Sequence, residues 1–174
     1  FFIDVKSKLA DQVKVKYINE ALNVIVNDFS QDAVVDFINN QLFAPSFASL
    51  SNEIFYQDKV TYDDIVNSIG IFEKYVIEKY ISGKTGKRSF FTEFKEGLTD
   101  KEKDKENCRL AEAVRKYLCN QLAPIKKGTY KISEWVAQVN LLLENPYFKQ
   151  NWQQYTLNMQ EIDDKYSRIA NQVD

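Results

Sequence analysis

Hydrophobic residues recur at spacings of three and four along most of the chain, which is the period of an amphipathic α-helix. The sharpest stripe lies near the C-terminus, where its members are separated by 4, 3, 4, 3, 4, 3 and 4 residues. These members are Phe148, Trp152, Tyr155, Met159, Ile162, Tyr166, Ile169 and Val173. Pro146 suits the first position of a helix, because its missing N–H needs no partner there. The pattern predicts a long closing helix that begins at Pro146.

The N-terminal part of the chain fits two descriptions. Residues 12–18 alternate between polar and apolar positions as in a strand, but a longer stripe recurs at helical spacing. That stripe consists of Val15, Ile18, Leu22, Ile25, Val26 and Phe29. The longer pattern favours a helix. Ser30 and Asp32 are suited to cap a second helix, which carries Val34, Phe37, Ile38 and Leu42 and ends before Pro45.

Capping residues divide the middle of the chain into further helices. Thr61 is a suitable N-cap for a broad apolar stripe, and Gly83 is a suitable left-handed stop for that helix. Ser89 is expected to open a short helix that ends at Gly97. The segment from Thr99 to Glu102 has the spacing of a capping box for the next helix.

The remaining helices complete an all-α prediction. The helix after Glu102 buries Leu110, Val114, Tyr117, Leu118 and Leu122, and it stops before Pro124; Ser133 opens another helix, which ends at Asn145. Five glycines and three prolines are too few for a turn-rich β fold. We therefore expect a single compact, multi-helix bundle-like domain over residues 1–174, with six to eight helices. Because the sequence starts at Phe1, we expect it to be a domain of a longer protein.

The composition limits the chemistry mainly by exclusion. The chain has no histidine, so it lacks His-based catalytic triads and the common His-containing zinc sites. The acidic pairs Asp63/Asp64 and Asp163/Asp164 are adjacent on helices, so the two carboxylates of each pair point about 100° apart. No apolar run is long enough to span a bilayer. We expect no catalytic residues, no cofactor, no metal and no membrane span, although an enzyme that uses carboxylates, lysines or tyrosines stays possible.

The two cysteines predict free thiols. Cys108 and Cys119 lie 11 residues apart in one predicted helix, which separates them by roughly 16 Å along its axis. That distance exceeds the reach of a disulfide, and two free thiols indicate a reducing, cytoplasmic compartment. Both cysteines fall on the side of the helix opposite its core stripe. We expect them to be exposed or covered by a second partner.

The string Gly83-Lys84-Thr85 is found at the end of phosphate-binding loops, but the spacing here is wrong. A phosphate-binding loop needs a glycine four residues before the Gly-Lys pair, and this chain has Lys79 there, inside a predicted helix. The string also follows an amphipathic helix, whereas such a loop follows a buried strand. The segment from Gly83 to Arg88 is better described as an exposed turn between helices.

The charge of that turn is more informative. Residues 82–131 contain 13 Lys or Arg and 7 acidic residues, a net charge of +6, whereas residues 1–81 and 132–174 are net negative. Two basic groups lie beside aromatic residues, and their six side chains are candidates for contact with a polyanion. They are Lys84, Lys87, Arg88, Lys126, Lys127 and Lys131. The whole-chain pI of about 5.4 argues against a dedicated nucleic-acid-binding protein. Ordinary solvated loops therefore remain an alternative.

The closing helix is the strongest candidate for an interaction surface. Its stripe is close to the two positions in seven of a coiled-coil seam, narrower than the usual face of a globular helix. Either it fills a groove of this domain, or Trp152, Tyr155, Met159 and Tyr166 bind a partner. We expect a non-catalytic docking or assembly module of a larger intracellular protein. The alternative is an accessory nucleic-acid-binding domain that uses the basic region 82–131.

Overall fold

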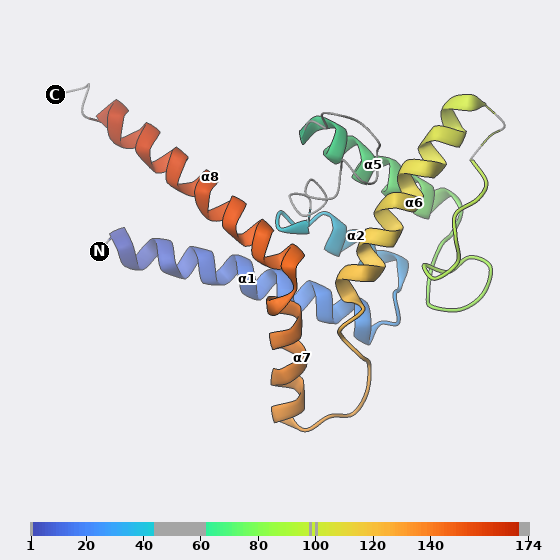
Figure 1. Ribbon diagram of the computed structural model, residues 1–174, viewed down its shortest axis with the longest axis horizontal. Coiled ribbons are helices and arrows are strands. Elements are labelled where there is room, and N and C mark those ends of the chain that lie inside the picture. Colours follow the sequence, from blue (N-terminus) through green and yellow to red (C-terminus); the bar gives the residue numbers. More distant parts are fainter. Residues whose placement is uncertain (1, 44–61, 98, 100, 171–174) are drawn as a thin grey trace.

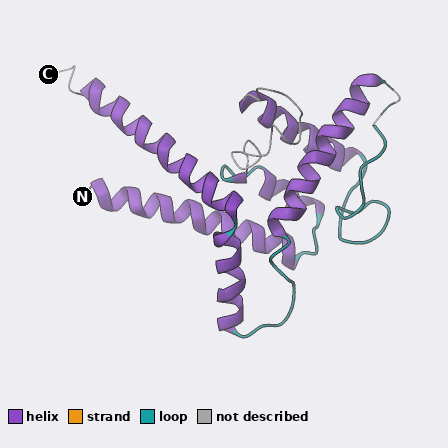
Figure 2. Cartoon of the chain, in the orientation of Figure 1, coloured by secondary structure: helices purple, strands orange, loops and turns teal. Residues whose placement is uncertain are grey.

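Helices are the only regular secondary structure of the described residues, which confirms the all-α prediction (Figures 1 and 2). The computed structural model describes residues 2–43, 62–97, 99 and 101–170. Six helices are found in this part of the chain. They are α1 (Phe2–Val26), α2 (Gln31–Ile38), α5 (Tyr62–Glu78), α6 (Glu102–Leu122), α7 (Ile132–Glu144) and α8 (Pro146–Ala170). The predicted start of α8 at Pro146 is confirmed, and so is the prediction that residues 12–18 are helical.

The helices form a packed body from which three of them extend (Figure 1). Helix α5 packs along α6, and α2 packs against both α1 and α5. Helices α1 and α8 reach out toward the same side and diverge toward their outer ends, whereas α7 projects from the body in another direction. This arrangement leaves a large part of α7 and of the outer halves of α1 and α8 without helical neighbours in the views shown.

A chain of aromatic rings joins four helices in the core. Tyr17 of α1 contacts Phe37 of α2 and Phe148 of α8, with ring centroids 5.4 and 5.2 Å apart. Phe43 links Phe37 to Tyr117 of α6 through edge contacts at 5.4 and 5.3 Å. All five side chains are buried, so their large apolar areas supply much of the driving force for folding.

Helices α1 and α5 both end with a residue in the left-handed conformation, and neither residue is glycine. After α1, Asp28 has φ +57°, and the Phe29 N–H donates to the carbonyl of Val24 at 2.8 Å. After α5, Tyr80 has φ +53°, and the Ile81 N–H donates to the carbonyl of Val76 at 2.9 Å. These bonds are the closing bonds of Schellman motifs.

The prediction that Gly83 stops α5 is therefore wrong. The left-handed stop is Tyr80, three residues earlier. Gly83 also has positive φ, +79°, but it serves the loop that follows. Its N–H donates to the carbonyl of Phe29 at 2.7 Å, and its own carbonyl accepts from the Phe90 N–H at 3.0 Å. Gly83 thus joins this loop to the end of α1.

The start of α6 also differs from the prediction. The helix begins at Glu102 with Lys101 as its N-cap, so Thr99 is not the N-cap of a capping box. The Thr99 hydroxyl instead donates to the carboxylate of Asp104. Helix α7 begins at Ile132, one residue before the predicted Ser133, and Glu134 accepts a hydrogen bond from the Lys131 N–H at 2.7 Å. The N-cap predicted at Thr61 lies outside the described residues.

Candidate functional site

The segment from Ser89 to Gly97 is an irregular loop, not the short helix that its sequence predicts. The reason is that α6 binds its backbone with four side chains. The Glu112 carboxylate accepts from the Phe94 N–H at 2.9 Å, and Arg115 donates to the carbonyl of Phe90 at 2.9 Å. The Cys108 and Cys119 thiols donate to the carbonyls of Phe94 and Phe90, both at 3.4 Å. These bonds replace those that a helix would provide.

The same contacts correct the expected environment of the cysteines. Cys108 is buried and Cys119 is half-buried, because the loop covers this side of α6. Burial raises the pKa of both thiols, so neither is poised as a thiolate nucleophile at neutral pH. Both thiols are free, as the helical separation predicts.

The six predicted cations fall into three places. Lys84, Lys126 and Lys127 line one cavity of about 390 Å³. Lys87 and Arg88 line a different cavity, which has Glu93 and Glu96 in its wall. Lys131 is the N-cap of α7. Of the two basic groups, only Lys84 from the first and Lys126 and Lys127 from the second come together at one cavity. Binding of nucleic acid by all six residues stays a prediction.

We call the first of these cavities the lysine cavity. Its floor is apolar and includes Ile25, Phe29 and Leu122, which are all buried. Phe91 stands at its edge, 52% exposed, and makes an edge contact with the ring of Phe29 at 5.1 Å. The lysines come from two loops that are far apart in the sequence, one after α5 and the other after α6.

Asp28 joins the two loops at this cavity. Its Oδ1 atom lies 3.9 Å from the Nζ of Lys84 and 3.6 Å from the Nζ of Lys127. The Lys84 ammonium also lies 5.2 Å from the ring centroid of Phe29, within the range of a cation–π contact. The left-handed turn at the end of α1 places Asp28 there, and the sequence pattern gives no signal for that position.

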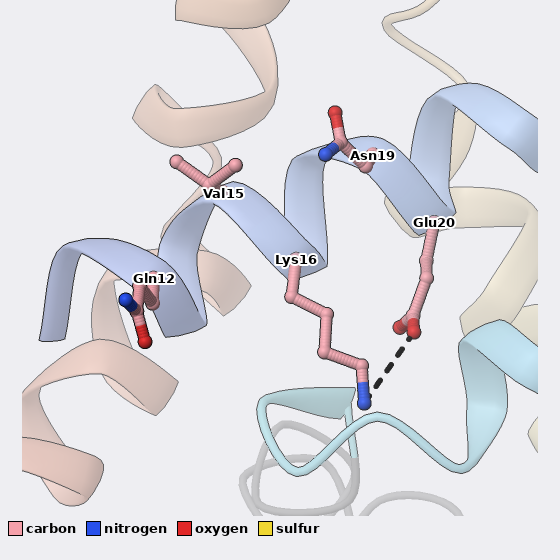
Figure 3. A pocket seen from close by; sticks show the side chains of 5 residues that line it. All are labelled: Gln12, Val15, Lys16, Asn19 and Glu20. Atoms are coloured by element: carbon pink, nitrogen blue, oxygen red, sulfur yellow. Dashed lines mark ion pairs between the residues drawn. The ribbon is translucent and has the colours of Figure 1, made fainter. Parts of the chain in front are cut away.

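A larger concavity, of about 510 Å³, lies along α1 (Figure 3). The residues that line it are Gln12, Val15, Lys16, Asn19 and Glu20. The one interaction drawn among them is an i,i+4 ion pair, in which the Lys16 Nζ lies 3.7 Å from Glu20 Oε1. All five belong to one helix and spread along its surface, so they do not converge on a common point as the polar groups of a binding site do.

The predicted partner-binding residues of α8 lie at different depths. Trp152 and Tyr155 are half-buried against the core, and Trp152 stacks on Phe148 and on Tyr155 with centroid distances of 6.4 and 5.7 Å. The Lys14 ammonium lies 3.9 Å from the centroid of a Trp152 ring. Met159 is half-buried. The side chain of Tyr166 lies outside the described part.

Helix α7 carries a more exposed apolar surface that the sequence prediction did not identify. From Trp135 to Leu143 it has no charged residue, yet only Leu142 of this helix is fully buried. Ile132 is 85% exposed and Val136 is 53% exposed. Ile132, Val136, Val139 and Leu143 are spaced 4, 3 and 4 residues apart and form one stripe, which we call the α7 seam.

The position of the α7 seam follows from the corner between α7 and α8. Asn145 is buried there; its side-chain amide donates to the carbonyl of Gln121 at 3.4 Å, and its side-chain oxygen accepts from the Tyr147 N–H at 2.9 Å. On the other side of α7, the Gln138 side chain accepts from the Lys126 N–H at 3.3 Å. These bonds hold one side of α7 to the body. They leave Ile132 and Val136 of the seam exposed, whereas Val139 is half-buried and Leu143 packs partly against the core.

Other kinds of site find no support among the described residues. In that part of the chain no three His, Cys, Asp or Glu side chains are grouped so as to hold a metal ion. Nor is any helix there both long and apolar enough to cross a membrane. Comparison of the chain with protein-family models, curated proteins and solved structures gives no match.

Proposed function

We propose that this domain is a non-catalytic assembly module that docks through the α7 seam. One observation carries the proposal: a helix without a charge over residues 135–143 leaves Ile132 and Val136 largely exposed. Single exposed apolar residues are common, but a stripe at 4–3–4 spacing is the pattern with which one helix packs on another. Depletion of charge is also typical of the centre of a protein interface.

We propose further that the occupant of the seam is a second copy of this chain, in antiparallel orientation. The seam is symmetric about its midpoint, so an antiparallel copy places Ile132 level with the partner's Leu143, and Val136 level with the partner's Val139. Such a pair is a two-fold symmetric interface that uses one patch on both copies. Each side supplies the apolar positions that the other needs.

The helix dipoles favour the antiparallel orientation, because an antiparallel copy sets the two dipoles against each other, whereas a parallel copy aligns them. The charges at the two ends of α7 are balanced and favour neither orientation. Lys131 lies beside Glu134 at the start of the helix, and Glu144 pairs with Lys149 at 3.4 Å at its end.

The size of the surface predicts a weak dimer. Helix α7 has 13 residues, so its face buries less than the ~800 Å² per partner of a standard interface. We therefore expect reversible association with a Kd on the order of 100 µM.

Replacing Val136 by glutamate is expected to weaken this association strongly. The added carboxylate would be buried at the centre of the seam without a partner, so Val136→Glu should weaken the dimer by at least about tenfold. Ala137→Glu is the matched control, because it adds the same charge to the next residue, which is exposed and points about 100° away. It should change Kd by less than about twofold. Sedimentation velocity over a concentration series measures both effects.

Two results would refute the proposal. One is a wild-type chain that sediments as a monomer up to about 1 mM, far above the expected Kd. The other is equal weakening by Val136→Glu and Ala137→Glu, which would show that net charge controls the association and the seam does not. The circular dichroism of each variant serves as the check that its helices are intact.

A further inference from the structure

We propose that the lysine cavity binds a small amphipathic anion, with a carboxylate or phosphate group at the lysines and an aliphatic or aromatic body in the cavity. Its volume of about 390 Å³ is within the range of small-molecule sites. Such sites are usually lined by apolar side chains with a few polar groups that fix the orientation of the ligand. The lysine cavity has this composition.

The apolar part of the cavity is formed by the ends of two helices and by the aromatic loop. Ile25 and Phe29 come from the end of α1, and Leu122 is the last residue of α6. Phe91 adds a half-exposed ring at the edge. Ile25, Phe29 and Leu122 are already buried, so the apolar surface that binding removes from water is that of the ligand chain and of the Phe91 ring, worth about 25 cal/mol per Å².

The charged part is arranged to hold one anionic group. Lys84 and Lys127 both lie within 4 Å of one oxygen atom of Asp28, so their ammonium groups already converge on a single carboxylate. Lys126 lines the same cavity. A ligand carboxylate or phosphate that enters here meets three lysines and one competing carboxylate, a net charge of +2. This excess of positive charge attracts an anion.

Asp28 does not line the cavity, but its carboxylate pairs with Lys84 and Lys127, which do, so it competes with a bound anion for these two lysines. Removing the charge of Asp28 should therefore increase the affinity of the lysine cavity for the anionic ligand. Asparagine is a suitable replacement, since it tolerates the positive φ of +57° at this position better than most residues. A variant that gains affinity is not easily explained by damage to the fold.

The test is a titration of the 15N-labelled chain, followed by amide chemical shifts. The probes are octanoate, octyl phosphate, octanol and inorganic phosphate. We expect octanoate or octyl phosphate, or both, to bind with a Kd on the order of 0.1–1 mM and to shift amides around Phe29, Phe91 and Lys127. Octanol and inorganic phosphate, which each lack half of the required chemistry, should bind at least about tenfold more weakly.

Variants then test the assignment of the site. Lys84→Gln/Lys127→Gln should weaken binding of the anionic amphiphile at least about tenfold, because it removes both cations that face Asp28. Lys87→Gln/Arg88→Gln removes the same charge from the neighbouring cavity and should have less than about a twofold effect. Asp28→Asn should strengthen binding at least about threefold.

Four results would overturn the proposal. They are equal affinity for octanol and octanoate, equal effects of the two double variants, unchanged or reduced affinity in Asp28→Asn, and shifts centred on α7. An oligothymidylate that binds more tightly than octyl phosphate and is lost in Lys84→Gln/Lys127→Gln would also overturn it. That result would assign the lysines to single-stranded nucleic acid, for which stacking of a base on Phe91 would be the reason.

Discussion

Replacing Phe37 by alanine is expected to lower the free energy of unfolding by about 3–5 kcal/mol. Phe37 is fully buried, and its ring contacts Tyr17 and Phe43 at centroid distances of 5.4 Å each. The change removes an aromatic side chain between α1 and α2 and leaves a cavity that the neighbouring rings can fill only in part. Since small domains are stable by about 5–15 kcal/mol, this loss is a large fraction of the total. Urea unfolding followed by circular dichroism measures it.

The control for Phe37→Ala is the same substitution at an exposed position. Phe91 is 52% exposed, so Phe91→Ala should cost about 1 kcal/mol or less. If Phe37→Ala fails to fold, Phe37→Leu keeps most of the volume and should still cost about 1–2 kcal/mol. Equal losses for Phe37→Ala and Phe91→Ala would contradict the aromatic core described above.

Replacing Glu112 by glutamine is expected to cost about 3 kcal/mol and to release the loop from Ser89 to Gly97. Both Glu112 oxygens bind the Arg115 guanidinium at 2.6 Å, and both side chains are only 11% exposed. An arginine guanidinium is always charged in proteins, so Arg115 keeps its charge when the Glu112 carboxylate is lost and is then left largely buried without that partner. Because Glu112 also accepts from the Phe94 N–H, the amide exchange of Phe94 should accelerate.

Two further variants separate the buried pair from a general effect of charge. Glu106→Gln breaks an exposed ion pair with Arg109 on the same helix and should change stability by less than about 0.5 kcal/mol. The double variant Glu112→Gln/Arg115→Gln removes both charges of the buried pair and leaves only the exposed Lys116 without its Glu112 partner, so it should be more stable than Glu112→Gln alone. Equal costs for Glu106→Gln and Glu112→Gln would show that the pair does not hold the loop.

The helices of this chain could be predicted because apolar residues recur at helical spacing along each of them, and this spacing holds even in α7, where only Leu142 is fully buried. The loop after α5 could not, since its conformation depends on a distant helix. Ser89, Phe90 and Phe94 have the spacing of a short helix, but Glu112 and Arg115 bind the backbone of this segment and stabilise an irregular loop. Tertiary hydrogen bonds overrode local propensity there.

The candidate surfaces were predictable to different extents. The charge of residues 82–131 indicated the basic loops, but only the turn at Asp28 brings Lys84 to Lys127 and separates them from Lys87. For α7, the apolar spacing predicted a helix with a buried face. It could not show that Ile132, Val136 and Leu141 lie exposed, because that depends on the corner at Asn145.

Pairing of two copies through the α7 seam is tested most directly by an isotope-filtered nuclear Overhauser experiment on a mixture of labelled and unlabelled chains, above the expected Kd. Antiparallel pairing of the α7 seam predicts contacts between the methyl groups of Ile132 and the partner's Leu143, and between those of Val136 and the partner's Val139. Parallel pairing would instead give contacts of Ile132 with the partner's Ile132. The absence of any contact between copies at α7 would contradict the proposed assembly surface altogether.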